Sequence, residues 1–235
     1  MVSNLLYDVV LHLGTLIALL IFFYQDISKY IIAFFQSFAK WQYHENTDQR
    51  VAWLLIIGTV PAAIIGFFLE DIITNYFRQP FWVAITLIVV ALLFFIGEKL
   101  SSFTKNIVDL TWRNSLFIGL AQAVALIPGV SRSGITILAG LKIGLTREVA
   151  ARFSFLLAIP IVLGAGLAKL LDLSSIAICP TELAVLISGL IASVITGYFC
   201  IKYFLKFLQK NTLIPFAIYR IILALAVLGY FYLLK

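Results

Sequence analysis

At the centre of this 235-residue sequence stands Pro128-Gly129-Val130-Ser131-Arg132-Ser133-Gly134-Ile135-Thr136. The stretch brings one guanidinium, three hydroxyls and two glycines into a chain that is otherwise strongly apolar. An arginine at membrane depth costs about 2.5–3.5 kcal/mol on insertion scales unless it is paired or faces water. Polar groups at that depth therefore indicate a functional site, and the alternative is a polar turn between two helices with Arg132 reaching the headgroups.

The residue types in this stretch favour an anion as the ligand, and phosphate in particular. Glycines let a ligand approach the backbone, and amide groups at the start of a helix point towards an anion. The planar fork of Arg132 matches phosphate or carboxylate oxygens. The predicted neutral contributors are Gly129, Ser131, Ser133, Gly134 and Thr136.

The composition is that of a polytopic membrane protein. Apolar residues make up 63% of the chain, charged residues only 12%, and the mean hydropathy is +1.07, whereas soluble proteins carry about 25% charged residues. The net charge of +6 comes from basic residues that lie between apolar stretches, as in cytoplasmic loops. We therefore exclude nucleic acid as a partner and expect the bilayer to be one.

Six stretches are long and apolar enough to cross a bilayer as helices, which takes about 20 residues. Between the first two stretches, an aromatic-rich segment at 30–43 is expected to rest at the membrane interface. The predicted spans are 5–24, 51–69, 81–97, 153–171, 183–205 and 213–233.

A seventh apolar stretch, 115–127, is too short to cross, because a helix of 13 residues reaches only roughly 20 Å. Pro128-Gly129 interrupts it, and 133–144 resumes as a second short helix. We interpret 115–144 as a re-entrant hairpin with the Ser-Arg-Ser loop at its tip, where irregular backbone must be buried in protein or line a wet cavity. The alternative is a single broken spanning helix.

The distribution of basic residues predicts the orientation. If the hairpin enters and leaves on one face, that face is cytoplasmic by its excess of Lys and Arg, and both termini are extracytoplasmic. The face with the excess holds twelve basic residues, at positions 29, 40, 50, 99, 105, 113, 142, 147, 152, 202, 206 and 210, and the opposite face holds three, at 78, 169 and 235.

An internal repeat divides the single predicted membrane domain, 1–235, into two parts. Residues 55–68 align without gaps with 186–199, and six of the fourteen positions are identical. The two helices are predicted to run in opposite directions, which indicates an inverted-topology repeat. Repeat one covers about 5–98 and repeat two about 115–235, so symmetry predicts a further hairpin ahead of residue 5.

The stretch 118–136 closely resembles the second signature of the bacterial undecaprenyl-diphosphate phosphatases, the bacitracin-resistance proteins. Further similarity lies at 10–15, 153–160 and 214–220, so the resemblance covers the chain from about residue 7 onward. Family members also carry, before the first span, a hairpin with paired glutamates and a Pro-Val-Ser-Ser-Thr-Gly-His stretch that this sequence does not show.

The resemblance implies hydrolysis of a polyprenyl diphosphate to the monophosphate and inorganic phosphate, in carrier-lipid recycling for the bacterial cell envelope. It implies a multi-pass protein of the bacterial inner membrane, with a site open to the periplasm and with homodimer formation allowed. A divalent cation, Mg²⁺ or Ca²⁺, is expected, with its ligands in the N-terminal segment that is not present. The competing functions are a lipid-phosphate transporter or flippase, and an inactive fragment of the phosphatase.

The predicted catalytic residues are Arg132, Ser131 and His12. Asp8 could orient His12 as a general acid or base, or the two could form a packed hydrogen-bonded pair. Gln122 could hold a water or a metal-bound oxygen, or join helices. Arg220 could contact the second phosphate, or pair with Glu98 or Glu182.

Overall fold

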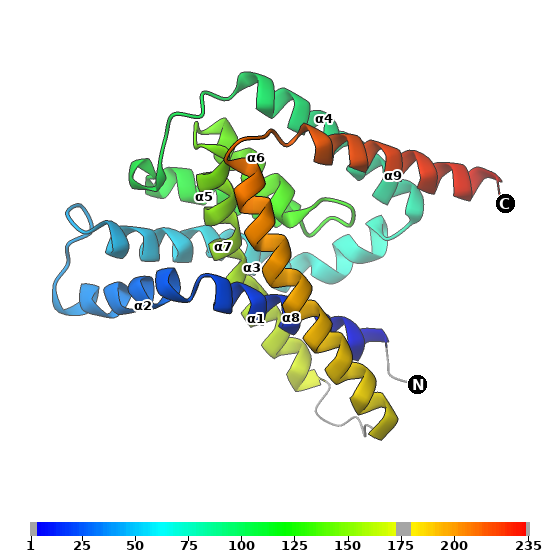
Figure 1. Cartoon of the computed structure of the whole chain (residues 1–235), viewed down its shortest axis with the longest axis horizontal. Coiled ribbons are helices and arrows are strands. Elements are labelled where there is room, and N and C mark those ends of the chain that lie inside the picture. The colour runs from blue at the N-terminus through cyan, green and yellow to red at the C-terminus, as the bar shows by residue number, and fades with distance from the viewer. Residues whose placement is uncertain (1–3, 173–179, 234–235) are drawn as a thin grey trace.

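The computed structural model of this protein describes residues 4–172 and 180–233 (Figure 1). The described residues form helices and loops, with one isolated bridge between Lys105 and Leu145. The all-α membrane fold predicted from composition is therefore confirmed. The helices are α1 Asn4–Phe22, α2 Tyr24–Ala39, α3 Thr47–Phe77, α4 Pro80–Leu100, α5 Trp112–Val124, α6 Arg132–Lys142, α7 Arg147–Asp172, α8 Pro180–Leu208 and α9 Ile214–Leu233, with a short 3-10 helix at Ile107–Asp109.

Within the described residues, five helices are long and apolar enough to span a membrane on their own: α3, α4, α7, α8 and α9. Helices α1 and α2 pass the same criteria only as a pair, and the pair is bent by 81° at its break, so it counts as a sixth candidate span. The bend lies between Phe22 and Tyr24, where the apolar stretch ends and the polar residues Gln25 and Asp26 follow. Since α2 carries Lys29 and exposes Phe35, its predicted position at the interface is compatible with an α1 that crosses the membrane.

Helices α5 and α6 form the predicted re-entrant hairpin. Helix α5 runs parallel to α3, because Ser115 donates to the carbonyl oxygen of Leu54 and Gly119 lies on Gly58. Helix α6 runs antiparallel to α7, since Gly140 meets Ala150 while Thr136 meets Ser154.

The two ends of the hairpin are tied together. The amides of Thr104 and Lys105 donate to the carbonyl oxygen of Gly144, at 3.0 and 2.9 Å. The Thr146 amide donates back to the Lys105 carbonyl oxygen at 3.0 Å. Entry and exit of the hairpin therefore lie on one side of the bundle, which excludes a broken helix that crosses to the other side.

Helix ends gather around the buried carboxylate of Glu98, and we call this region the Glu98 end; it comprises Asp26, Glu98, Arg147, Arg152 and Leu213. Glu98 accepts from the Arg147 guanidinium at 2.5–3.0 Å and from the Leu213 amide at 2.7 Å. Arg152 donates to Asp26 at 2.6 Å. The start of α2 and the end of α4 thus meet the starts of α7 and α9.

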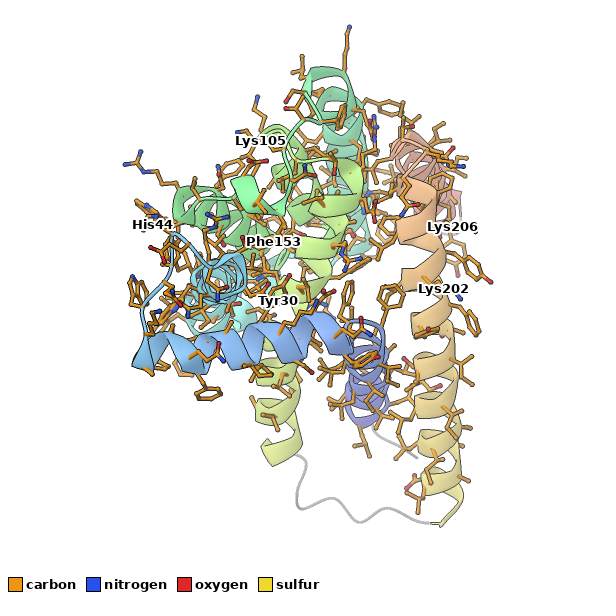
Figure 2. The ribbon with its side chains drawn as sticks, turned by 60° about the vertical axis from the view of Figure 1, so that its left-hand side comes forward. Tyr30, His44, Lys105, Phe153, Lys202 and Lys206 are labelled. Carbon is orange, nitrogen blue, oxygen red and sulfur yellow. The ribbon has the colours of Figure 1, made fainter. Side chains whose placement is uncertain are left out.

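Helices α3 and α8, which carry the internal repeat, run in opposite directions relative to this end. Arg50, at the start of α3, donates to the Val108 carbonyl oxygen just before the hairpin, and Gln209, which follows α8, donates to Glu148 at the start of α7. Lys202 and Lys206 follow one another along the last turns of α8 (Figure 2). The opposite directions are those an inverted repeat requires, and the division into two repeats stays a prediction.

Both repeated helices use small residues for close packing. Gly58 of α3 lies against Ser115 and Gly119 of α5, and a Cβ added to Gly119 would meet the backbone of Gly58. In α8, Ser193 approaches Gly14 of α1, and Gly197 approaches Ala18. In lipid, the hydrophobic effect does not drive helices together, so helix association depends on close packing. Small residues allow the backbones to approach closely enough for it. The hairpin is thereby fixed against α3 and held at membrane depth.

Candidate anion site at the hairpin tip

The tip of the hairpin is an irregular loop between α5 and α6. Ala125 ends α5, and the Val130 amide donates to the Ile127 carbonyl oxygen at 3.1 Å. Pro128 has no amide hydrogen and cannot continue the helix. Gly129 has φ of +87°, in the left-handed region that side chains disfavour. The Pro-Gly pair thus turns the chain and leaves the carbonyl groups of the tip to find other partners.

Helix α6 begins directly after this turn, with Ser131 as its N-cap. The Ser131 hydroxyl oxygen accepts from the Gly134 amide at 3.1 Å, and the Ile135 amide donates to the Ser131 carbonyl oxygen. An N-cap serine satisfies one of the free amides of the first turn. The hydroxyl proton of Ser131 is still available to a ligand, and the positive end of the helix dipole favours a negative one.

The start of α6 borders a cavity of about 840 Å³. Its polar lining comes from Ser131, Ser133, Arg220 and Thr15. Its other walls are apolar and largely aromatic, from α4, α6, α7, α8 and α9: Phe94, Gly134, Ile137, Phe155, Gly197, Phe199, Cys200, Ile201, Tyr203, Phe204, Phe207, Leu213, Phe216 and Tyr219. Helices α8 and α9 diverge from the loop that joins them (Figure 1), and the cavity lies between them. Ser131, Ser133 and Arg220 lie at or beside the hairpin tip, whereas most of the cavity wall is apolar. Such a cavity suits a ligand with a polar head and an apolar chain.

Arg132 occupies the first position of α6, between the lining residues Ser131 and Ser133, but its own side chain does not line this cavity. The side chain is half-buried, and it makes no hydrogen bond or ion pair with any of the described residues. It shares a helix face with Thr136, which is directed at α7. Its fork of donors is therefore not used by the fold.

Arg220 supports the tip through backbone carbonyl groups. Its guanidinium donates to the Gly129 carbonyl oxygen at 2.9 Å and to that of Leu87 at 3.4 Å. The predicted pairing with Glu98 is wrong, because Glu98 binds Arg147. The irregular loop places the Gly129 carbonyl group beside Arg220, and this group accepts the hydrogen bond that was predicted for a carboxylate. Arg220 also lines the cavity, so its predicted phosphate contact stays a prediction.

Thr136 turns away from the cavity. Its hydroxyl lies 2.6 Å from the Ser154 hydroxyl of α7 and donates to the Arg132 carbonyl oxygen at 2.8 Å. Both side chains are almost fully buried, at 1% and 2% exposure. The structure therefore gives Thr136 a contact between α6 and α7, and it does not place the hydroxyl among the lining residues predicted for phosphate.

Gln122 is buried in α5 at 3% exposure, and neither its amide nitrogen nor its oxygen has a hydrogen-bond partner within the described part of the chain. It lies on the stripe of α5 that faces α3, one turn beyond Gly119. Buried polar groups are normally paired, so this amide marks a place for a bridging water or ligand atom. It does not line the cavity.

His12 is exposed, and its Nδ1 lies 2.8 Å from the backbone carbonyl oxygen of Asp8, not from the carboxylate. The predicted orienting role of the Asp8 carboxylate is therefore not seen. Thr15, one turn further along α1, does line the cavity. The structure thus brings Ser131, Ser133, Gly134 and Arg220 to one cavity and leaves His12 outside its lining.

A divalent cation would need several carboxylate or other oxygen ligands. Within 4–172 and 180–233, no group of three or more His, Cys, Asp or Glu side chains lies close enough to share a metal ion. The hairpin offers hydroxyls and guanidinium groups. The described residues do not fit a dedicated cation site, so we derive no step through one.

Two contacts of the tip were not predicted from the sequence. Thr86 of α4 donates to the Pro128 carbonyl oxygen at 2.9 Å, and Ser154 pairs with Thr136. A signal was present in both cases, because each is a lone hydroxyl in an apolar span. The pattern alone does not tell which carbonyl or hydroxyl such a residue meets.

The fold and the tip define a polytopic α-helical membrane protein. Its re-entrant hairpin presents helix-start hydroxyls and an arginine that has no partner among residues 4–172 and 180–233. The family model described as "Bacitracin resistance protein BacA" matches residues 2–226. The chain belongs to this family.

Curated relatives agree with that assignment. The chain is 45% identical over 220 residues to an undecaprenyl-diphosphatase of Geotalea daltonii, covering 93% of the chain and 81% of the relative. It is 41% identical over 226 residues to undecaprenyl-diphosphatase 1 of Pseudoalteromonas translucida, covering 96% and 84%. An undecaprenyl-diphosphatase of Aliivibrio salmonicida is 42% identical over 230 residues, covering 97% and 84%.

Proposed function

We propose that this protein is a membrane-embedded phosphatase that hydrolyses undecaprenyl diphosphate to the monophosphate and inorganic phosphate. The observation that carries the proposal is the family membership, with relatives named undecaprenyl-diphosphatase at 41–45% identity along more than four fifths of their length. The hairpin tip supports it, because it offers donors for phosphate oxygens beside a cavity that suits a lipid.

In the proposed reaction, water attacks the terminal phosphorus, the phosphoanhydride P–O bond breaks, and the lipid monophosphate leaves with the bridging oxygen. Phosphoryl transfer asks a protein mainly to position the group and to neutralise charge on its oxygens. Arg132 serves this purpose with its unused fork, and the Ser131 and Ser133 hydroxyls and the first amides of α6 complete the donors. Gly134, which lines the cavity, is proposed to lie beside the phosphate, and Gly129 is proposed to support it through the turn that precedes α6.

The other predicted site residues are proposed to have separate roles. Arg220 and Gln122 are proposed to bind substrate directly or through water. His12, which is exposed and outside the cavity lining, is proposed as a proton carrier for water or product. Thr136 is proposed to stabilise the packing of α6 on α7 and not to contact the substrate.

A dependence on Mg²⁺ or Ca²⁺ stays a prediction from the family. We expect a chelator such as EDTA to lower phosphate release by the purified protein and added Mg²⁺ or Ca²⁺ to restore it. Full release after exhaustive chelation and gel filtration would contradict this expectation.

We propose further that the Glu98 end faces the cytoplasm and that both termini and the entrance of the phosphate site face the periplasm. The excess of basic residues near this end supports the orientation. In Figure 1, the start of α1 and the end of α9 both lie on the right, opposite the loop that joins α2 to α3. Cysteine accessibility on spheroplasts tests the orientation, and light scattering of the detergent-solubilised protein tests the predicted homodimer.

The decisive experiment is phosphate release from undecaprenyl diphosphate by the purified chain in detergent. We expect release that is stoichiometric with formation of the monophosphate lipid. Substrate binding without release would support the carrier alternative, and neither binding nor release would support the inactive fragment.

A further inference from the structure

The hydroxyl of Thr86 makes two contacts of different kinds. It lies 2.9 Å from the carbonyl oxygen of Val83 in its own helix, a common contact for a helical threonine, and also 2.9 Å from the carbonyl oxygen of Pro128 in the hairpin tip. The second contact joins residues 42 positions apart and is not needed by α4. Thr59 of α3 provides the contrast, because its hydroxyl bonds to Leu55 in its own helix.

The backbone of the tip presses directly on this part of α4. A Cβ added to Gly129 would collide with the Thr86 hydroxyl and would lie 2.8 Å from the Val83 carbonyl oxygen. With φ of +87° at Gly129, a side chain at this position would also strain the backbone. Thr86 therefore meets the loop where it turns most sharply.

The carbonyl groups of two consecutive tip residues accept no hydrogen bond from the backbone of α5 or α6. Side chains of two spanning helices donate to them instead. Thr86 of α4 donates to Pro128, and Arg220 of α9 donates to Gly129. Helices α4 and α9 pack together through Ala84, Leu87 and Ala224. The polar groups of irregular backbone inside a membrane need hydrogen-bond partners from protein or water. Here side chains of the packed pair α4 and α9 are those partners.

Ser131 follows Gly129 by two residues, and its hydroxyl caps α6. The position of the Pro128 and Gly129 carbonyl groups therefore sets where α6 begins and where its first amides and hydroxyls point. We propose that Thr86 is a positioning residue for the phosphate site, acting through the Pro128 carbonyl group without touching the substrate. This inference rests on the proposed phosphatase function for its effect on turnover, but not for its effect on the tip.

The test compares three variants. Thr86→Val keeps the shape and removes the hydroxyl, Thr86→Ser keeps the hydroxyl, and Thr59→Val is the matched control, since Thr59 is also half-buried in a spanning helix but bonds only within it among the described residues.

The first measurement is hydrogen–deuterium exchange of peptides covering 125–137 in the purified protein. We expect Thr86→Val to speed exchange of the amides of Val130, Gly134 and Ile135 at least severalfold, while Thr86→Ser and Thr59→Val match the wild type. Unchanged exchange in Thr86→Val would overturn the contact, whether or not the protein is a phosphatase.

The second measurement is steady-state phosphate release. Displacing catalytic groups by about 1 Å can cost on the order of 100-fold in rate, so we expect Thr86→Val to lower kcat roughly tenfold with a smaller change in KM. Thr86→Ser should restore the rate, and Thr59→Val should keep it. A loosened tip with wild-type kcat, or an equal loss in Thr59→Val, would overturn the positioning role. A wild-type protein without turnover would contradict the proposed function and leave the exchange result to decide the contact.

Discussion

The hairpin tip and the Glu98 end each contain an arginine at the start of a helix, and the two arginines have opposite surroundings. Arg147, at the start of α7, makes three hydrogen bonds to Glu98 and lies 3.9 Å from the centre of the Phe103 ring. Arg132, at the start of α6, has no partner within the described residues. A paired arginine holds helices together, whereas an unpaired one at membrane depth costs free energy that only a ligand or water can offset.

The same contrast holds for the neutral polar groups of the two regions. At the tip, Thr86 and Arg220 satisfy the backbone of the loop, while Ser131 and Ser133 border the cavity. At the Glu98 end, the carboxylate is 4% exposed and its oxygens are fully used by Arg147 and Leu213. Removing polar groups at the Glu98 end should therefore affect stability, and removing the unused donors of the tip should affect turnover.

The largest effect on stability is expected from Glu98→Ala. Removing one partner of a buried ion pair leaves an uncompensated charge and costs about 3–5 kcal/mol. Thermal and denaturant unfolding in detergent should show this loss, with turnover per folded molecule retained. Glu45→Ala, at an exposed position, is the control and should change little. If Glu98→Ala unfolds like the wild type, the two regions do not differ as described.

A smaller loss is expected where the hairpin packs on α3. A Cβ at Gly119 would meet the backbone of Gly58, which cannot move aside as a flexible side chain could. Overpacking of this kind costs about 1–3 kcal/mol, so Gly119→Ala should lower the unfolding temperature. Gly164→Ala in α7 has no atom within 4 Å of its new Cβ and should stabilise the helix by about 0.5–1 kcal/mol. Equal effects of the two variants would contradict close packing of the hairpin.

The smallest effect is expected from Thr136→Val. Its hydroxyl pairs with Ser154, and a hydrogen bond contributes about 0.5–1.5 kcal/mol net. We expect a modest loss of stability with turnover retained. A loss of turnover at unchanged stability would instead restore the substrate contact that the sequence predicted.

Much of the fold could be predicted because hydropathy and chain length constrain it. The spans and the hairpin follow from apolar runs and from the Pro-Gly interruption at 128–129. Predicted helices fell short of the observed ones, as for 51–69 within Thr47–Phe77, because charged and polar residues continue a helix beyond the apolar core. The 81° bend between α1 and α2 was predicted only as an end of the span near residue 24.

The site was less predictable, because contacts depend on which way each side chain points. Residue types at 128–136 predicted hydroxyls at the start of a helix, and the structure places Ser131 and Ser133 there. Thr136 lies in the same motif but faces α7, and only the packing of α6 on α7 determines that. Arg220 donates to carbonyl groups and not to Glu98, because the irregular tip leaves the Gly129 carbonyl oxygen without a helical donor.

Phosphate release and unfolding of two matched variants, Arg132→Lys and Arg147→Lys, directly compare the arginine of the tip with the arginine of the Glu98 end. A lysine keeps the charge but cannot replace a bidentate fork. We predict that Arg132→Lys lowers kcat/KM roughly 100-fold or more at unchanged stability, a loss typical of removing one donor to a developing charge. Arg147→Lys should lower the unfolding temperature and keep turnover. Turnover retained in Arg132→Lys, or lost no more than in Arg147→Lys, would contradict the account.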